Sequence, residues 1–453
     1  MASSAERAPT VPPATRQTRQ GRAPRPLLRA LLTLAVLPAL RDTPPTVAIT
    51  QPPTTPVPHV LPVPPHLYIS YLLIDHADGL AVELGAAVGP GASGTGDNRL
   101  ALANLHTGAL VATAPISGAE DSSAILFAID TAAHAVLVMS PAGGLGLFVA
   151  FALPAPAARQ RAAATPLQPL VRVAVPHLIS AVYNPRRHEA YGLTEAGQVV
   201  TIATAPRPGV PLGAILHTTA SDTQVLSIGG EVVLDAPRDR LYIKRTHDIV
   251  LLDLPTGRTT PLPVALPSAS YRITTVEPHS GDLLIAVQPP HQTTNKTVAD
   301  AVMRVSPTSG QVRWRTRVTY PLIHGAFDDG LNDTALDPIH HRLLYWVDGL
   351  LRGLEMDTGA LLYTRPVAPN AAGVLDPALG LLLYAPQNSP ILTLDDRTGR
   401  IAASLPAPQG VGIPTLDAPT HTVYLTLHTL GTTPTVTGIA VIPLAYRHAV
   451  AAA

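Results

Sequence analysis

A single sequence pattern returns along most of this chain. An apolar run ends in an acidic residue, a turn follows, and three further apolar runs come after it, the last two separated by a Thr-Gly pair. The pattern is clearest in "VVLDAPRDRLYIKRTHDIVLLDLPTGRTTPL" at 232–262 and in "GVLDPALGLLLYAPQNSPILTLDDRTGRIAASL" at 373–405. Internal repeats of this length indicate an array of similar structural units, so they set the fold class.

Eight copies of the pattern can be aligned on the residue that ends the first run, 39 to 60 residues apart. Such a period is typical of four-stranded propeller blades. After residue 66 the apolar runs are short and bounded by turn residues, which favours strands over helices. The sequence therefore predicts an all-β protein, a β-propeller of four-stranded blades over 67–445. Eight blades are favoured over seven because eight copies align; seven stays the alternative because three copies depart at the Thr-Gly pair. The eight anchor residues are Asp75, Asp130, Asn184, Asp235, Glu277, Asp337, Asp376 and Asp417.

The last copy is one strand short. A ring of blades must close to remove its sheet edges. We expect the segment "TVAIT" at 46–50 to supply the missing strand by pairing near 438–443. The alternative is "YRHAV" at 446–450, within the C-terminal tail 446–453.

The copies resemble those of the YVTN-type and related bacterial propeller families. The resemblance rests on the turn acid, the "RLYI" or "RLLY" run after it, and the Thr-Gly pair before the closing strand, and it covers about residues 68–445. It implies a propeller of a surface or secreted protein. It names no ligand, because propellers host many unrelated functions.

The N-terminal region divides into three parts. Residues 1–26 are basic and Pro-rich, and we expect them to be disordered; 27–40 are apolar, and 41–66 form a Pro- and Thr-rich linker. A positive flank before a short apolar stretch is typical of a secretory signal. An uncleaved anchor and a buried helix are the alternatives. The sequence thus predicts an exported, extracytoplasmic or cell-surface protein, and we expect a monomer.

Composition excludes several classes of function. Lys plus Arg and Asp plus Glu balance at 31 each, so there is no basic excess for nucleic-acid binding. The absence of cysteine excludes disulfides, thiolate nucleophiles and iron–sulfur clusters. No Gly-x-Ser-x-Gly elbow or phosphate-binding loop is present. Only "TSGQVRW" at 308–314 is similar to the repeat of eight-bladed quinone-dependent dehydrogenases, and we expect no cofactor.

The connections between strands divide between the two faces of a propeller. The anchor-acid turns and the Thr-Gly turns share one face, and the irregular loops 85–98, 155–169, 288–300 and 323–333 are assigned to the other. Variable loops on a rigid scaffold commonly carry binding. Ligand contacts are therefore predicted at the ends of the second strands of three blades, where the chain offers Lys244, Arg245, His247, Trp346, Asp348, Gln387 and Asn388.

Acidic residues offer two readings as metal ligands. Anchor acids that bond the backbone of their own turns explain the whole series, so we predict a structural role for them. The loop "FDDGLND" places Asp328, Asp329 and Asp333 together as a metal candidate, although the full calcium-loop pattern is absent. A solvated acidic loop is the alternative, and "HH" at 340–341 is interpreted as a solvated turn.

These features favour a non-catalytic, exported or surface-associated propeller that binds a protein, peptide or polymer on its irregular face. The alternative is a propeller enzyme, either a quinone-type oxidoreductase or a lactone hydrolase or lyase. Paired catalytic acids are recognised by their separation in space, which the sequence does not give.

Overall fold

The computed structural model describes most of the repeat region. The described residues are 58–62, 67–87, 98–116, 126–142, 145–155, 164–221, 231–245, 248–264, 266, 271–287, 297–321, 333–347, 349–368, 371–406, 410–428 and 436–444. The predicted leader, the apolar segment 27–40 and the C-terminal tail lie outside them. Within the described ranges, no helix is long and apolar enough to cross a bilayer.

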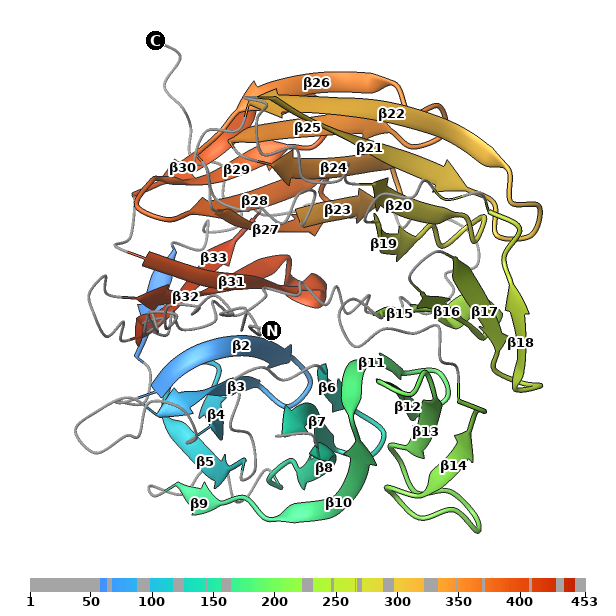
Figure 1. Cartoon of the computed structure of the whole chain (residues 1–453). Coiled ribbons are helices and arrows are strands. Elements are labelled where there is room, and N and C mark those ends of the chain that lie inside the picture. Colours follow the sequence, from blue (N-terminus) through green and yellow to red (C-terminus); the bar gives the residue numbers. More distant parts are fainter. Residues whose placement is uncertain are drawn as a thin grey trace, which may run out of the picture.

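Eight antiparallel sheets follow one another around a ring, with the first strand of each sheet innermost (Figure 1). This confirms the eight-bladed β-propeller. The first four blades are β2 (Leu67–Asp75), β3 (Leu80–Ala87), β4 (Asn98–Asn104) and β5 (Leu110–Pro115); β6 (Leu126–Asp130), β7 (Ala135–Ala142), β8 (Leu145–Ala152) and β10 (Pro169–Pro176); β11 (Leu178–Asn184), β12 (Glu189–Thr194), β13 (Val199–Ala203) and β14 (Ile215–Thr218); and β15 (Glu231–Asp235), β16 (Arg240–Lys244), β17 (Ile249–Asp253) and β18 (Arg258–Pro261).

The second half of the ring repeats this order. Blades five to eight are β19 (Tyr271–Val276), β20 (Leu283–Val287), β21 (Thr297–Val305) and β22 (Val312–Pro321); β23 (Asp333–Asp337), β24 (Arg342–Val347), β25 (Leu350–Glu355) and β26 (Leu361–Pro366); β27 (Ala371–Asp376), β28 (Leu381–Pro386), β29 (Ile391–Asp395) and β30 (Ile401–Leu405); and β31 (Gly410–Asp417), β32 (Thr422–His428), β33 (Val436–Pro443) and β1 (His59–Leu61). Two 3₁₀ turns, η1 (Ala236–Arg238) and η2 (Ala418–Thr420), follow two of the anchor acids.

The anchor acids close their own turns, as the sequence predicts. The Asp337 carboxylate accepts hydrogen bonds from the backbone N–H groups of residues 339 and 340, both at 2.9 Å. Asp130 and Asp376 each accept two backbone N–H groups in the same way. Asp235 and Asp417 instead bond side chains of their turns, those of residues 238 and 420. All eight anchors are buried, so these bonds offset the cost of removing a carboxylate from water.

The Thr-Gly turn fixes the spacing between neighbouring blades. Gly359 has φ +72°, which a residue with a side chain adopts only with strain. A Cβ there would lie 2.6 Å from the ring of Trp314 in the preceding blade. Glycine is therefore required both by the turn and by the close approach of the preceding blade.

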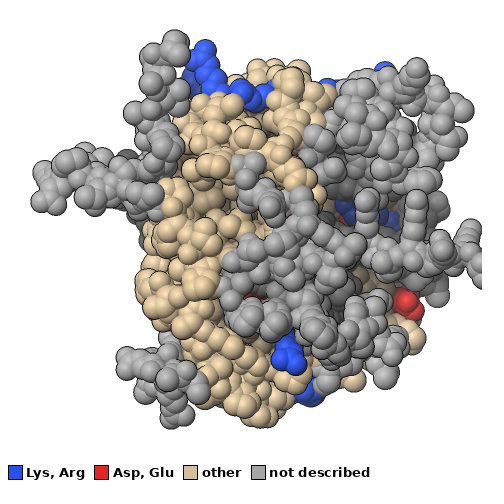
Figure 2. Space-filling view, turned by 90° about the vertical axis from the view of Figure 1, so that its left-hand side faces the viewer, with Lys and Arg blue, Asp and Glu red and all other residues tan. Residues whose placement is uncertain are grey.

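Each blade buries both faces of its sheet. Leu80 and Val82 of β3 pack with Phe127 of the second blade, whereas Ala81 packs with Tyr424 of the last blade. Because the side chains alternate across the strand, one blade needs a neighbour on either side. The described part of the face in Figure 2 is mainly uncharged, with Lys and Arg along its upper edge and again in its lower part.

The ring is closed by a strand from the N-terminal side, but not by 46–50. β1 pairs antiparallel with β33, with Val60 opposite Ala440, and Leu61 is buried in the seam with the first blade. Only residues 62–66 separate β1 from β2, so the apolar residues nearest the first blade take the outer position. The segment 46–50 lies outside the described residues.

The loop 155–169 is not on the predicted face. It joins β8 to β10, the third and fourth strands of the second blade, and it includes β9 (Thr165–Pro166), which pairs parallel with β5. It therefore lies on the face of the anchor-acid turns. The second copy lacks a Thr-Gly pair, and this long connection takes the place of the short turn.

Removal of β1 should destabilise the ring. Deleting residues 1–62 removes β1 together with Leu61 and exposes the outer edge of β33, whereas deleting 1–56 retains β1. We expect the longer deletion to lose about 2 kcal/mol or more of unfolding free energy and to aggregate on heating. Thermal melts with light scattering measure both effects, and identical melts for the two truncations would show that β1 does not hold the ring closed.

Glu83 should make stability fall as pH rises. It lies on β3 and is fully buried, its carboxylate has no hydrogen-bond partner in the described structure, and burial raises its pKa from 4.5 to about 8. The unfolded chain releases this proton above pH 4.5 while the folded chain holds it, so stability declines between pH 4.5 and 8 by about 1.4 kcal/mol per unit.

Replacement of this carboxyl tests the cause of the pH dependence. We expect Glu83→Gln, which keeps the shape of the side chain and cannot ionise, to flatten the decline. The unfolding free energy of the variant should therefore rise relative to that of the parent as pH rises from 5 to 8. Urea unfolding at several pH values gives the comparison. Parallel stability profiles for the two proteins would mean that Glu83 is ionised in the folded state throughout.

Candidate functional site

The predicted contact residues occupy different environments at the ends of the second strands. Lys244 ends β16 and Arg245 follows it, while Gln387 and Asn388 form the exposed turn between β28 and β29. Asn388 has φ +58°, a conformation that Asn tolerates better than most residues, so the turn itself favours it. His247 and Asp348 lie outside the described residues. The ligand role of these side chains stays a prediction.

Trp346 is part of the core. It is 6% exposed, its indole N–H donates to the carbonyl of Ala371 at 3.2 Å, and its ring meets that of Tyr384 edge to face. Its partners belong to the next blade, so the side chain holds the seam between the sixth and seventh blades. Little of its surface is left for a ligand.

A charged cluster lies where the fourth and fifth blades meet on the irregular face. Lys244 stands directly opposite Glu231 across the first two strands of the fourth blade, and Arg272 of β19 reaches Glu231 at 3.6 Å. The Lys244 ammonium lies 5.4 Å from the ring centre of Tyr271. The Tyr271 hydroxyl donates to the carbonyls of residues 245 and 248, and Arg245 pairs with Asp248 at 3.4 Å. This group is the blade 4–5 cluster: Glu231, Lys244, Arg245, Asp248, Tyr271 and Arg272.

The cluster differs from the rest of the inner strands. Among first-strand residues whose exposure is described, Glu231 and Arg272 are the only charged side chains that are partly exposed. The other partly exposed side chains on these strands are apolar or neutral, and the anchor acids are buried. One oxygen of Glu231 and one of Asp248 are buried without a hydrogen-bond partner in the described part of the chain. Three cationic and two anionic groups thus gather around acceptors that an incoming donor could satisfy. The arrangement suits a polar or charged group of a partner.

The sequence identified two of the six residues of this cluster. Lys244 and Arg245 were predicted, whereas Glu231, Asp248, Tyr271 and Arg272 were not. Pairing the first two strands of the copy across the Asp235 turn would have placed Glu231 opposite Lys244. No comparable signal marks Arg272, because it comes from the next blade.

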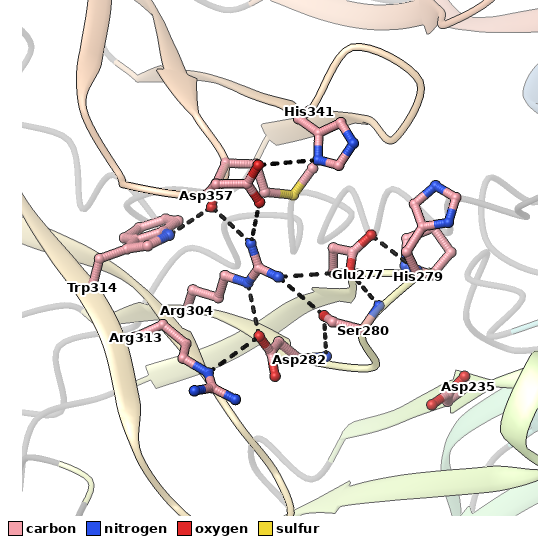
Figure 3. A network of polar contacts seen from close by, with 12 residues as sticks. Asp235, Glu277, His279, Ser280, Asp282, Arg304, Arg313, Trp314, His341 and Asp357 are labelled. Carbon is pink, nitrogen blue, oxygen red and sulfur yellow. Dashed lines mark hydrogen bonds and ion pairs between the residues drawn. The ribbon is translucent and has the colours of Figure 1, made fainter.

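The largest polar network lies on the opposite, anchor-acid face. In Figure 3, the guanidinium of Arg304 on β21 sits between two blades. It donates to Asp282 at 2.9 Å and to Ser280 at 3.1 Å in its own blade, and to Asp357 at 2.9 Å and the carbonyl of Met356 at 3.0 Å in the next. The same carbonyl accepts the indole N–H of Trp314 (Figure 3). These contacts join the fifth and sixth blades.

Glu277, the anchor of the fifth blade, lies beside this network. Burial alone raises its pKa, but the hydrogen bonds from Ser280 and from the backbone N–H of His279 outweigh burial and hold the pKa below its usual value. Arg304 approaches within 3.8 Å. The carboxylate is therefore held ionised as a structural group.

The acidic loop proposed as a metal site is described only at its end. Asp333 begins β23 and pairs with Trp346 in the sheet register. Asp328 and Asp329 lie outside the described residues. The metal assignment of this loop stays a prediction.

Comparisons with known proteins identify the fold. No family model matches the chain, and no curated protein matches its sequence. Solved propellers are similar in structure: Sqt1 of Saccharomyces cerevisiae has 12% identity and a TM-score of 0.57, covering 84% of this chain and 97% of that chain. The C-terminal WD40 domain of Sif2 has 10% identity and a TM-score of 0.54, covering 84% of this chain and 99% of that chain.

A computationally designed propeller, Ika8, is similar to the same extent. It has 10% identity and a TM-score of 0.53, and the match covers 85% of this chain and all of that chain. The class is thus a propeller-repeat protein with WD40-like neighbours. The finer resemblance to YVTN-type proteins stays a prediction.

Loss of the Arg304 side chain should strongly destabilise the ring. Arg304→Ala leaves Asp282 and Glu277 buried without their cation, and breaking a buried ion pair in this way costs about 3–5 kcal/mol. Arg313→Ala is the matched control, since Arg313 is 47% exposed and only 3.7 Å from Asp282; it should cost less than about 1 kcal/mol. Urea unfolding compares the two, and equal losses would contradict a central role for Arg304.

Proposed function

We propose that this chain is a non-catalytic propeller scaffold that binds a protein or peptide partner on its irregular face. The observation that carries the proposal is the contrast between the two faces. Most anchor-acid and Thr-Gly turns are short and bond their own backbone. The connections from second to third strands and between blades vary in length, and the blade 4–5 cluster lies among them.

The structural neighbours support a scaffold role in general terms. Propellers of the WD40 class are commonly interaction scaffolds. The matches to two such similar structures cover 84% of this chain and 97% or more of those chains. The enzyme alternative stays a prediction. We extend the proposal to an exported or surface-associated protein, on the basis of the positive flank and apolar segment at 16–40.

Site-specific photo-crosslinking tests which face binds. A photoreactive amino acid replaces Gln387 on the irregular face or Ile339 on the anchor-acid face; both positions are exposed in turns. In cells that express the full chain, we expect specific adducts of defined mass from position 387 and few from 339. Equal labelling from both faces would contradict the proposal.

A charge variant then tests the blade 4–5 cluster. Lys244→Gln should lower the yield of the position-387 adduct roughly tenfold, because a lost charge contact of about 1.4 kcal/mol has that effect. Arg258→Gln, a change at an exposed arginine on the outer strand β18, is the control and should leave the yield unchanged. Unchanged adducts in the Lys244 variant would remove the cluster from the binding surface.

A further inference from the structure

One position in the repeat carries an unusual residue in the seventh blade. In seven blades, the residue after the third strand donates its backbone N–H to a carbonyl of that blade's first turn, as Thr204 does to His188 and Asp396 does to Gly380. The residues at this position are Leu105, Leu153, Thr204, Leu254, Met356, Asp396 and Leu444. The seventh blade thus places a carboxylate where the others place an apolar side chain or a hydroxyl.

This position faces the anchor acid of the preceding blade. Thr204 donates its hydroxyl to the Asp130 carboxylate at 2.6 Å. At the equivalent seam between blades six and seven, Asp396 faces Asp337, so two carboxylates meet where a donor and an acceptor meet elsewhere. Asp396 is 2% exposed, and its Oδ2 has no hydrogen-bond partner in the described structure. An ionised carboxylate buried in this way requires a cationic partner.

Arg342 supplies part of that charge. Its guanidinium donates to the other oxygen, Oδ1, of Asp396. Two carboxylates and one guanidinium leave a net charge of −1, with the unpartnered oxygen still buried. The existing contacts are therefore incomplete for a doubly ionised pair.

The same seam offers an imidazole. His340 Nδ1 lies 2.7 Å from Asp337, and its side chain is 39% exposed, which gives access from solvent. In three other seams a histidine of the following blade bonds the anchor acid. In two of them, His188 to Asp130 and His421 to Asp376, the histidine directly precedes the second strand of its blade. The seventh blade has Gly380 at this position, so no ring enters from that side.

Together these groups have the donor set of an open metal site. We propose that Asp337, His340 and Asp396 bind a divalent transition-metal ion, with Zn²⁺ the expected ion. One ligand atom from each of the three lies within 4.8 Å of the others. Ligands on one Zn²⁺ lie roughly 3 to 4 Å apart, so side-chain shifts of a fraction of an ångström complete the site. Carboxylate oxygens with imidazole are accepted ligands of Zn²⁺, and exposed His340 leaves room for a water in the fourth position.

Metal and proton compete at His340. The short contact between its Nδ1 and Asp337 is a hydrogen bond when that nitrogen carries a proton. A bound ion takes the place of that proton and of this hydrogen bond.

The experiment measures Zn²⁺ binding to the full chain after removal of metals with a chelator. Isothermal titration should give one equivalent for the parent protein. Asp396→Thr reproduces the chemistry of Thr204 in the third blade and should abolish that equivalent; His340→Ala should weaken it at least tenfold. His341→Ala is the matched control, because His341 pairs with Asp357 outside the group, and it should bind like the parent.

Two further readouts keep the result interpretable. Asp396→Asn retains the shape of the side chain, and it replaces the Thr variant if that variant does not fold. The absorbance of bound Co²⁺ reports the ligand geometry, and Zn²⁺ should raise the melting temperature of the parent but not of the Asp396 variants. Absence of the equivalent in the folded parent, or its persistence in the Asp396 variants, would overturn the proposal. A failure here leaves the binding role of the irregular face untouched, because the two sites lie on opposite faces.

Discussion

The structure depends on the packing of one blade's apolar face against the next. A four-stranded sheet with side chains of alternating direction has two faces to bury, and in a ring each neighbour covers one of them. The seam between the last and first blades is built from both ends of the repeat region: Leu61 and Leu72 come from the beginning, and Tyr424, Ile439 and Val441 from the end. β1 is therefore as much a part of the last blade as β33 is, although almost 400 residues of sequence separate them.

The buried anchor acids fit into this packing because several of them act in two directions. Within its own blade the acid accepts hydrogen bonds from its turn, which ends the first strand and directs the chain into the second. Across the seam it accepts a bond from the next blade, as Asp130 and Asp376 do from His188 and His421, and Asp417 does from His76 in the first blade. The last of these contacts bridges the closing seam. One residue type at one repeat position thus fixes both the turn and the register of neighbouring blades.

The sequence was sufficient for the fold because the fold is periodic. The repeat indicated the four-stranded unit and the turn role of the anchors, and it favoured eight blades over seven. The missing strand of the last copy indicated closure from the N-terminal side. It placed that strand at 46–50 because apolar alternation was the only criterion; the short tether of residues 62–66 selects 59–61. Loop 155–169 was misplaced because the missing Thr-Gly pair concealed the boundary between the third and fourth strands.

The candidate site was harder to predict from the sequence, for a different reason. Contacts within a blade follow from strand register, so Glu231 could have been placed opposite Lys244. Contacts between blades follow from how two sheets twist against each other, and no local pattern reports that. Trp346 shows the same limit: its position at a strand end indicated exposure, and its burial arises from Tyr384 and Ala371 of the next blade.

A repeat protein also contains its own comparisons. Where seven blades share a backbone hydrogen bond, a change of side chain at that position isolates what the side chain does. Leu at this position adds apolar packing to the seam, and Thr204 adds a hydroxyl that satisfies the anchor. Asp396 adds a buried carboxyl beside Asp337, and Arg342 donates to only one of its oxygens. The shared backbone hydrogen bond places all three side chains at the same point of the seam, so the change of side chain is what makes the proposed metal site possible.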